Sequence, residues 1–94
     1  MTIEEFQTTL DGLLKNFPDS GFDTITYNEI GELDKFYSEA DSLGMELGKK
    51  LIFNLAEALK TRKSGGNTDE SVQIRLTAMD FYIKKLQNGS IEDL

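Results

Sequence analysis

The stretch Thr26–Lys63, TYNEIGELDKFYSEADSLGMELGKKLIFNLAEALKTRK, decides the fold. It opens with Thr26-x-x-Glu29, a capping box in which each side chain accepts a backbone N–H left free at a helix start. Apolar or small residues then recur at positions 30, 33, 37, 40, 44, 47 and 51. Spacings that alternate between three and four place these residues on one helix face, so the pattern predicts a helix over 26–63.

The middle of this stretch contains two glycines, Gly44 and Gly48. They cost about 2 kcal/mol of helix propensity compared with alanine. The apolar phase nevertheless continues through Ser42, and no Glu or Gln stands three residues after Asp41 or Ser42 to open a second capping box. We therefore expect one long helix that is bent rather than broken, with a break near 42–48 as the alternative.

A continuous helix over 26–63 would be roughly 55 Å long at about 1.5 Å per residue. A compact chain of this size has a radius of gyration of about 12 Å, so the remaining residues are too few to cover such a helix. Ala40, Gly44 and Gly48, spaced by four, remove side-chain bulk from one face. This row has two interpretations: a close crossing by the first helix of the chain, or a seam for self-association.

Two further helices flank the central stretch. Thr2-x-x-Glu5 is a second capping box and predicts a helix over 2–16, whereas the last helix is predicted over 68–88, before a short acidic tail at 89–94. The last helix carries a core stripe and, on another face, a second apolar line: Ile74, Ala78 and Phe81. Two stripes require two neighbours, which are another helix of the chain or a second copy.

The predicted fold is all-α. We expect a single domain over 1–94, built as a small antiparallel bundle of three helices, or of four helices if the central one breaks.

Composition excludes several classes of protein. The 94 residues carry a net charge of −7, contain no apolar run of membrane-spanning length, and begin without the basic region of a signal peptide, so we expect no membrane association and a cytoplasmic location. The sequence has no cysteine and no histidine, which removes thiol chemistry, the commonest general base and the usual metal ligand. We expect no catalysis, no metal and no cofactor.

Charge is divided unevenly along the chain. Residues 1–47 carry a net charge of −9 and residues 48–88 a net charge of +4. Such asymmetry indicates an interaction surface or internal complementarity. In an antiparallel dimer along the long helix, the acidic half of one copy would face the basic half of the other.

The basic residues form one candidate site: Lys49, Lys50, Lys60, Arg62 and Lys63. The last three lie in the final turn of the central stretch, where cations stabilise the negative end of the helix dipole. They are also candidates for binding the phosphates of a nucleotide or nucleic acid. No aromatic residues for base stacking are interleaved with them, and the net charge opposes nucleic-acid binding, so we expect chiefly a solvated surface.

Asp41-Ser42-Leu43, followed by Glu46-Leu47, is similar to the Asp-Ser-Leu motif of acyl carrier proteins. In that family the serine carries phosphopantetheine at the start of an acidic recognition helix, so the resemblance implies a carrier modified at Ser42. The gap from the serine to Glu-Leu is one residue shorter than in the family, and the residues after it turn basic at Lys49 and Lys50.

Together these patterns predict a non-catalytic interaction module, such as a small regulatory, adaptor or inhibitor protein. We expect it to bind a protein partner and to form a homo-oligomer through helix surfaces. The candidate interface residues are Ala40, Gly44, Gly48, Ile74, Ala78 and Phe81. The alternatives are a carrier modified at Ser42 and a binder of a phosphate-containing ligand at Lys60–Lys63.

Overall fold

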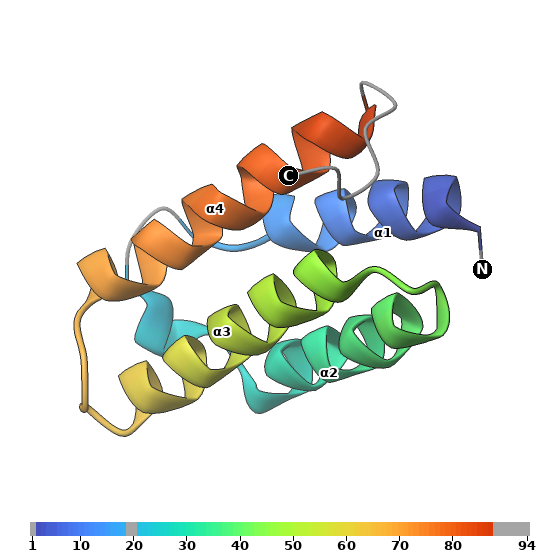
Figure 1. Cartoon of the computed structure of the whole chain (residues 1–94). Coiled ribbons are helices and arrows are strands. Elements are labelled where there is room, and N and C mark those ends of the chain that lie inside the picture. Colours follow the sequence, from blue (N-terminus) through green and yellow to red (C-terminus); the bar gives the residue numbers. More distant parts are fainter. Residues whose placement is uncertain (1, 19–20, 88–94) are drawn as a thin grey trace.

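The computed structural model describes residues 2–18 and 21–87, which form four α-helices and one short 3-10 helix (Figure 1). The elements are α1 (Ile3–Lys15), η1 (Phe22–Thr24), α2 (Tyr27–Ser42), α3 (Glu46–Lys63) and α4 (Asp69–Gln87). The chain reverses direction between consecutive helices, so the predicted all-α antiparallel bundle is confirmed. Residue 88 and the predicted tail at 89–94 lie outside the described residues.

Side-chain caps open α1, α2 and α4, and those of α1 and α2 are the capping boxes that the sequence predicts, whereas α3 begins without one. In α2, the Thr26 hydroxyl accepts the Glu29 N–H at 3.2 Å, and the Glu29 carboxylate accepts the Thr26 N–H at 3.1 Å. The same reciprocal pair, Thr2 and Glu5, opens α1. At α4, the Thr68 hydroxyl accepts the N–H of Ser71 at 3.3 Å. Each cap satisfies backbone N–H groups that have no partner inside the helix.

The prediction of one continuous helix over 26–63 is wrong, because α2 ends at Ser42 and α3 begins at Glu46. Gly44 has φ 72°, a left-handed conformation that glycine adopts without a Cβ clash. The Met45 N–H donates to the Ala40 carbonyl at 2.9 Å, and the Gly44 N–H donates to the Asp41 carbonyl at 3.2 Å. These two bonds form a Schellman motif, which satisfies the last carbonyls of α2 and turns the chain.

The break lets α3 fold back along α2, so the apolar residues of the two helices cover one another (Figure 1). Ala40 and Met45 are buried beside the corner. One turn before Ala40, Phe36 of α2 meets Phe6 of α1 edge to face, with ring centroids 5.7 Å apart. The core therefore forms around a hairpin of two helices instead of along one rod.

The connection before α2 also belongs to the core. Phe22 and Ile25 are 1% and 2% exposed, so this loop packs into the core. Their burial fixes η1 against the start of α4 and the end of α3. None of the helices in residues 2–18 and 21–87 combines the length and the apolar character that a membrane crossing requires.

Candidate functional site

An open apolar groove of about 460 Å³ lies between α3 and α4. Its lining residues are Leu47, Leu51, Ile74, Thr77, Ala78, Phe81 and Tyr82. Ile74 and Phe81 are large apolar side chains that remain 63% and 60% exposed. We call this surface the apolar groove.

The groove arises because α4 has apolar residues on two faces. One stripe, which includes Val72, Met79 and Ile83, is buried in the core. Ile74 and Phe81 lie on the opposite side of the helix, as the period of 3.6 residues requires. The sequence predicts this second stripe, and the described part of the chain leaves it uncovered.

Tyr82 lines the groove and packs closely on Gly48 of α3. A Cβ atom placed on Gly48 would lie 2.6 Å from the Tyr82 hydroxyl oxygen, so the tyrosine ring uses the space that glycine leaves. Tyr82 itself is only 2% exposed. The helix that crosses Gly48 closely is therefore α4, and the expectation that the first helix of the chain does so is wrong.

The row Ala40, Gly44 and Gly48 does not form one surface. Ala40 is fully buried, Gly44 occupies the exposed corner after α2, and Gly48 lies under Tyr82. A seam along these three residues requires a continuous helix, and the break at Gly44 removes it. Of the predicted interface residues, Ile74, Ala78 and Phe81 are the three that the structure brings together on one exposed face.

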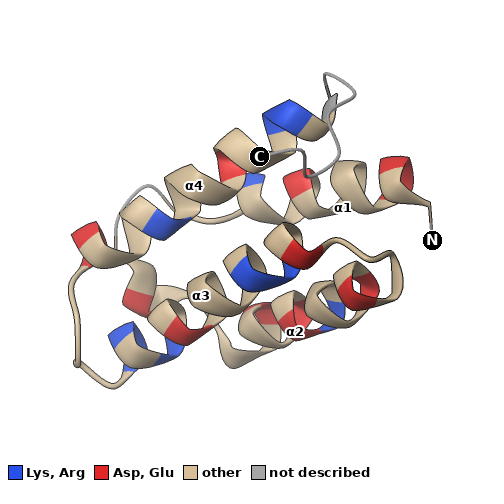
Figure 2. Cartoon of the chain, in the orientation of Figure 1, with Lys and Arg blue, Asp and Glu red and all other residues tan. Residues whose placement is uncertain are grey.

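The predicted basic site is dispersed (Figure 2). Lys49 bridges the corner between α2 and α3: its Nζ lies 2.9 Å from an oxygen of Asp41 and 3.2 Å from an oxygen of Glu46. The hydrogen bond to Asp41, followed by the one to Glu46, raises the pKa of Lys49 above its ordinary value. Lys60 pairs with Glu57 at 3.6 Å, whereas Lys50 is exposed without an ion pair among the described residues.

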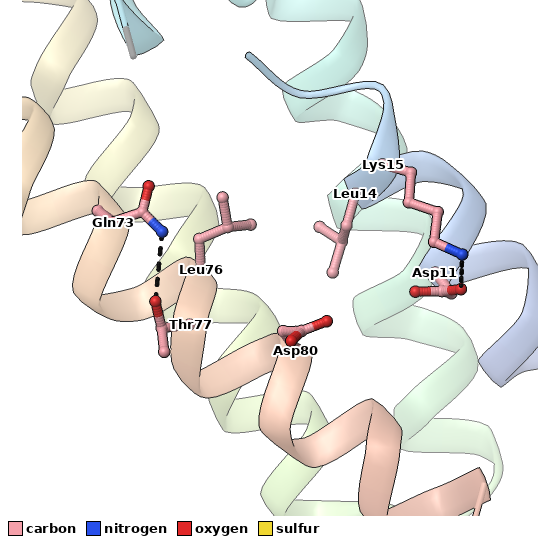
Figure 3. A pocket seen from close by; sticks show the side chains of 7 residues that line it. All are labelled: Asp11, Leu14, Lys15, Gln73, Leu76, Thr77 and Asp80. Carbon is pink, nitrogen blue, oxygen red and sulfur yellow. Dashed lines mark hydrogen bonds and ion pairs between the residues drawn. The ribbon is translucent and has the colours of Figure 1, made fainter. Parts of the chain in front are cut away.

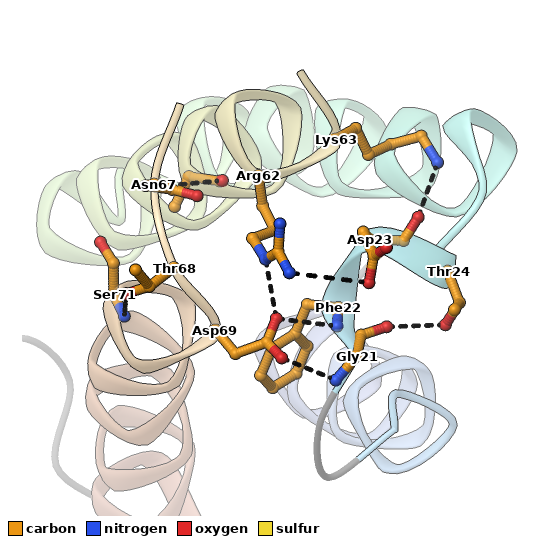
Figure 4. A network of polar contacts seen from close by, with 11 residues as sticks. Gly21, Phe22, Asp23, Thr24, Arg62, Lys63, Asn67, Thr68, Asp69 and Ser71 are labelled. Carbon is orange, nitrogen blue, oxygen red and sulfur yellow. Dashed lines mark hydrogen bonds and ion pairs between the residues drawn. The ribbon is translucent and has the colours of Figure 1, made fainter. Parts of the chain in front are cut away.

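Arg62 and Lys63 are occupied by the chain itself (Figure 4). Arg62 Nε donates to Asp69 Oδ1 at 2.8 Å. Lys63 Nζ donates to the backbone carbonyl of Ile25 at 2.7 Å and to that of Asp23 at 3.2 Å. These contacts hold the end of α3 on η1, so the five basic residues do not converge on one anion site.

Asp69 is the central residue of this network, and its role has no signal in the local sequence. Its Oδ2 accepts the Gly21 N–H at 2.9 Å, and its Oδ1 accepts the Phe22 N–H at 3.1 Å (Figure 4). The hydrogen bond from Arg62, followed by that from Gly21, lowers the pKa of Asp69. Its loop partners are 47 and 48 residues away in the chain, so only the tertiary structure brings them together.

A smaller pocket of about 220 Å³ lies between α1 and α4 (Figure 3). Its polar side chains satisfy one another within each helix. Asp11 pairs with Lys15 at 2.9 Å, and the Gln73 amide donates to the Thr77 hydroxyl at 3.3 Å. Asp80 pairs with Lys84 at 2.9 Å. Most of the polar side chains that line this pocket are therefore already paired, so few of them are available to bind a ligand.

Ser42, the residue on which the carrier resemblance depends, is exposed and is the last residue of α2. The next helix, α3, begins four positions later at Glu46. The resemblance implies a serine at the start of a helix, and the structure places Ser42 at the end of one.

Comparison of the chain with protein-family models, with curated proteins and with solved structures found no match.

Proposed function

We propose that the protein is a non-catalytic interaction module that binds another polypeptide chain in the apolar groove of α3 and α4. The observation that carries this proposal is the joint exposure of Ile74 and Phe81, at 63% and 60%, in one groove with Leu47 and Leu51. Contiguous exposed apolar surface costs solubility, and it marks sites that a partner covers.

The edge of the groove also suits a protein interface. Lys85 places its Nζ 5.3 Å from the centroid of the Phe81 ring. Interfaces of this kind combine an apolar centre, often with an aromatic anchor, and a charged rim that stays hydrated. Phe81 is the natural anchor, because it is the largest exposed side chain in the groove.

The titratable groups support a non-catalytic role. The sequence has no histidine or cysteine, so general acid–base chemistry at neutral pH would require a carboxylate with a raised pKa, or a lysine or tyrosine with a lowered one. Among the residues that the structure describes, the two carboxylates with a shifted pKa are Glu5 and Asp69. Hydrogen bonds lower both pKa values, first that from the Thr2 backbone and that from Arg62 respectively. Those shifts stabilise the charged form and serve the fold.

A photo-crosslinking experiment tests whether the groove is covered in the cell. A benzophenone amino acid replaces Phe81 in one variant and Phe53 in a matched control, because Phe53 is 51% exposed on α3 beside Tyr37 of α2. We expect irradiation of cells to give discrete covalent protein adducts from position 81 and few from position 53. Equal yields at the two positions, or none at position 81, would contradict the proposal.

A further inference from the structure

We propose that the occupant of the apolar groove is a second copy of this chain, docked so that the two α4 helices pack antiparallel about a two-fold axis. The axis passes between Thr77 and Ala78 of each copy. This inference rests on the proposed function and names the partner for the same surface.

The apolar residues of α4 are arranged symmetrically about that axis. Ile74 lies as far before the midpoint of Thr77 and Ala78 as Phe81 lies after it. A two-fold axis there places Ile74 of one copy against the partner's Phe81, and the reverse contact follows by symmetry. Ile74 and Phe81 of each copy are then covered by Phe81 and Ile74 of the other copy, so one contact, repeated by symmetry, covers both exposed side chains.

The charged residues obey the same symmetry. Glu70 and Lys85 are also equally distant from the midpoint, and at 3.6 residues per turn they share with Ile74, Ala78 and Phe81 an arc of about 80° on the helix. The antiparallel pair places Glu70 opposite the partner's Lys85 at both ends of the contact. A parallel pair would set Glu70 against the partner's Glu70, so charge complementarity selects the antiparallel register.

The centre of the contact permits close approach. Thr77 and Ala78 are both exposed and small, so the two helix axes can come within about 8 Å. Leu47 and Leu51 of α3 are partly buried beside them and add apolar surface to the same groove. Each α4 would thus lie against α4 and the adjoining edge of α3 in the other copy.

Molar mass in solution tests the inference with the full-length chain. We expect sedimentation equilibrium of the wild type to approach twice 10.6 kDa as the concentration rises. Phe81→Ser should give the monomer mass throughout, whereas Phe53→Ser, the matched loss of an exposed phenylalanine, should leave the equilibrium unchanged. Circular dichroism checks that all variants remain folded.

Charge reversal tests the register. Glu70→Lys alone and Lys85→Glu alone should each weaken the dimer about tenfold, because each replaces two attractive contacts by two repulsive ones. Mixing the two variants should restore association. Lys at position 70 of one variant then meets Glu at position 85 of the other, and the second contact, between Lys85 of the first variant and Glu70 of the second, is also attractive.

Three outcomes would overturn the inference: a wild-type monomer at every concentration, a dimer that survives Phe81→Ser, or a mixture of the two charge variants that associates no better than each alone. A wild-type monomer that still forms crosslinks from position 81 to a different protein in cells would overturn the self-association and leave the proposed function standing. Absence of both signals would reject both.

Discussion

At the scale of single residues, the Asp69 carboxylate joins the start of α4 to the end of α3 and to the segment before α2. It accepts hydrogen bonds from Arg62 of α3 and from the backbone N–H groups of Gly21 and Phe22 before α2. The Phe22 side chain beneath it is buried. A charged acceptor that serves several donors is sensitive to removal, because each donor must then find another partner.

Asp69→Asn should therefore lower the melting temperature of the protein. The amide keeps the shape of the side chain and loses both the charge that pairs with Arg62 and one of the two acceptor oxygens. Thermal unfolding followed by circular dichroism measures the effect. Glu4→Gln is the control, because Glu4 is an exposed acid in the first turn of α1. Equal melting temperatures for the two variants would contradict the role of Asp69.

The contribution of Asp69 should also depend on pH in a defined direction. Its pKa is lowered in the folded chain, so folding favours the ionised form. The resulting stability is fully present above the ordinary aspartate pKa of about 4 and is lost as the pH falls through the lowered folded value. The difference in unfolding free energy between wild type and Asp69→Asn should shrink in that acid range. A difference that stays constant down to the lowest pH would refute the assignment.

Gly48→Ala should lower the free energy of unfolding by about 1–2 kcal/mol, because its methyl group would overlap the ring of Tyr82 in a buried contact. Gly31→Ala is the matched control in the interior of α2, where a Cβ meets nothing within 4 Å. That change should raise the free energy of unfolding by about 0.5–1 kcal/mol through helix propensity. Urea denaturation of both variants measures the two changes in unfolding free energy. An increase in that free energy for Gly48→Ala would show that the Tyr82 ring moves aside without cost.

At the scale of elements, Gly44 decides whether the central stretch is one helix or two. Because its φ is 72°, Gly44→Ala should lower the free energy of unfolding by about 1–2 kcal/mol, although nothing lies within 4 Å of the new Cβ. In a continuous helix the same change would raise it by about 1 kcal/mol. Urea denaturation of Gly44→Ala, with Gly12→Ala in α1 as a control, measures the change in unfolding free energy. A decrease indicates the turn at Gly44, and an increase would indicate a continuous helix.

The sequence predicts the caps of α1 and α2 and most of the apolar faces correctly, and it gives the corner at Gly44 only as the alternative to a bent helix. In α2 it places Tyr37 on the core face, whereas Phe36 is buried and Tyr37 is exposed. The capping boxes at Thr2 and Thr26 are local, since donor and acceptor lie three residues apart. The apolar spacing, in contrast, continues across the corner, because each half keeps its own face toward the core. Periodicity therefore cannot distinguish a bent helix from a helical hairpin, and the deciding contribution is the left-handed glycine with the burial of Met45.

At the scale of the whole molecule, the break at Gly44 brings the acidic and basic halves of the chain together within one molecule. The acidic first half and the basic second half meet within one chain, through Lys49 with Asp41 and through Arg62, whose guanidinium lies 3.9 Å from Asp23. The predicted antiparallel dimer required a continuous helix over 26–63, along which the acidic half of one copy would pair with the basic half of the other. The break at Gly44 removes that helix. The proposed association therefore uses α4, whose second apolar stripe, including Ile74 and Phe81, is exposed.

If the groove binds a second copy, the stability of the protein should depend on its concentration. Only folded chains can associate there, so the melting temperature of the wild type should rise as protein concentration increases. Ile74→Ser/Phe81→Ser should remove this dependence and leave the melting temperature at high dilution nearly unchanged, because both side chains are exposed in the single chain. Differential scanning calorimetry over a wide concentration range makes the comparison. A melting temperature of the wild type that does not change with protein concentration would contradict the prediction.

The sequence by itself determined the helices, their caps and the two apolar stripes of α4, because these depend on residues three or four positions apart. It also determined the absence of histidine and cysteine chemistry. Only the tertiary structure decided that the chain turns at Gly44, that Tyr82 packs on Gly48, and that Arg62 and Lys63 are bound by the chain itself. Those features depend on contacts between residues of different elements. Such contacts depend on how the helices pack against one another, and the local sequence does not specify that packing.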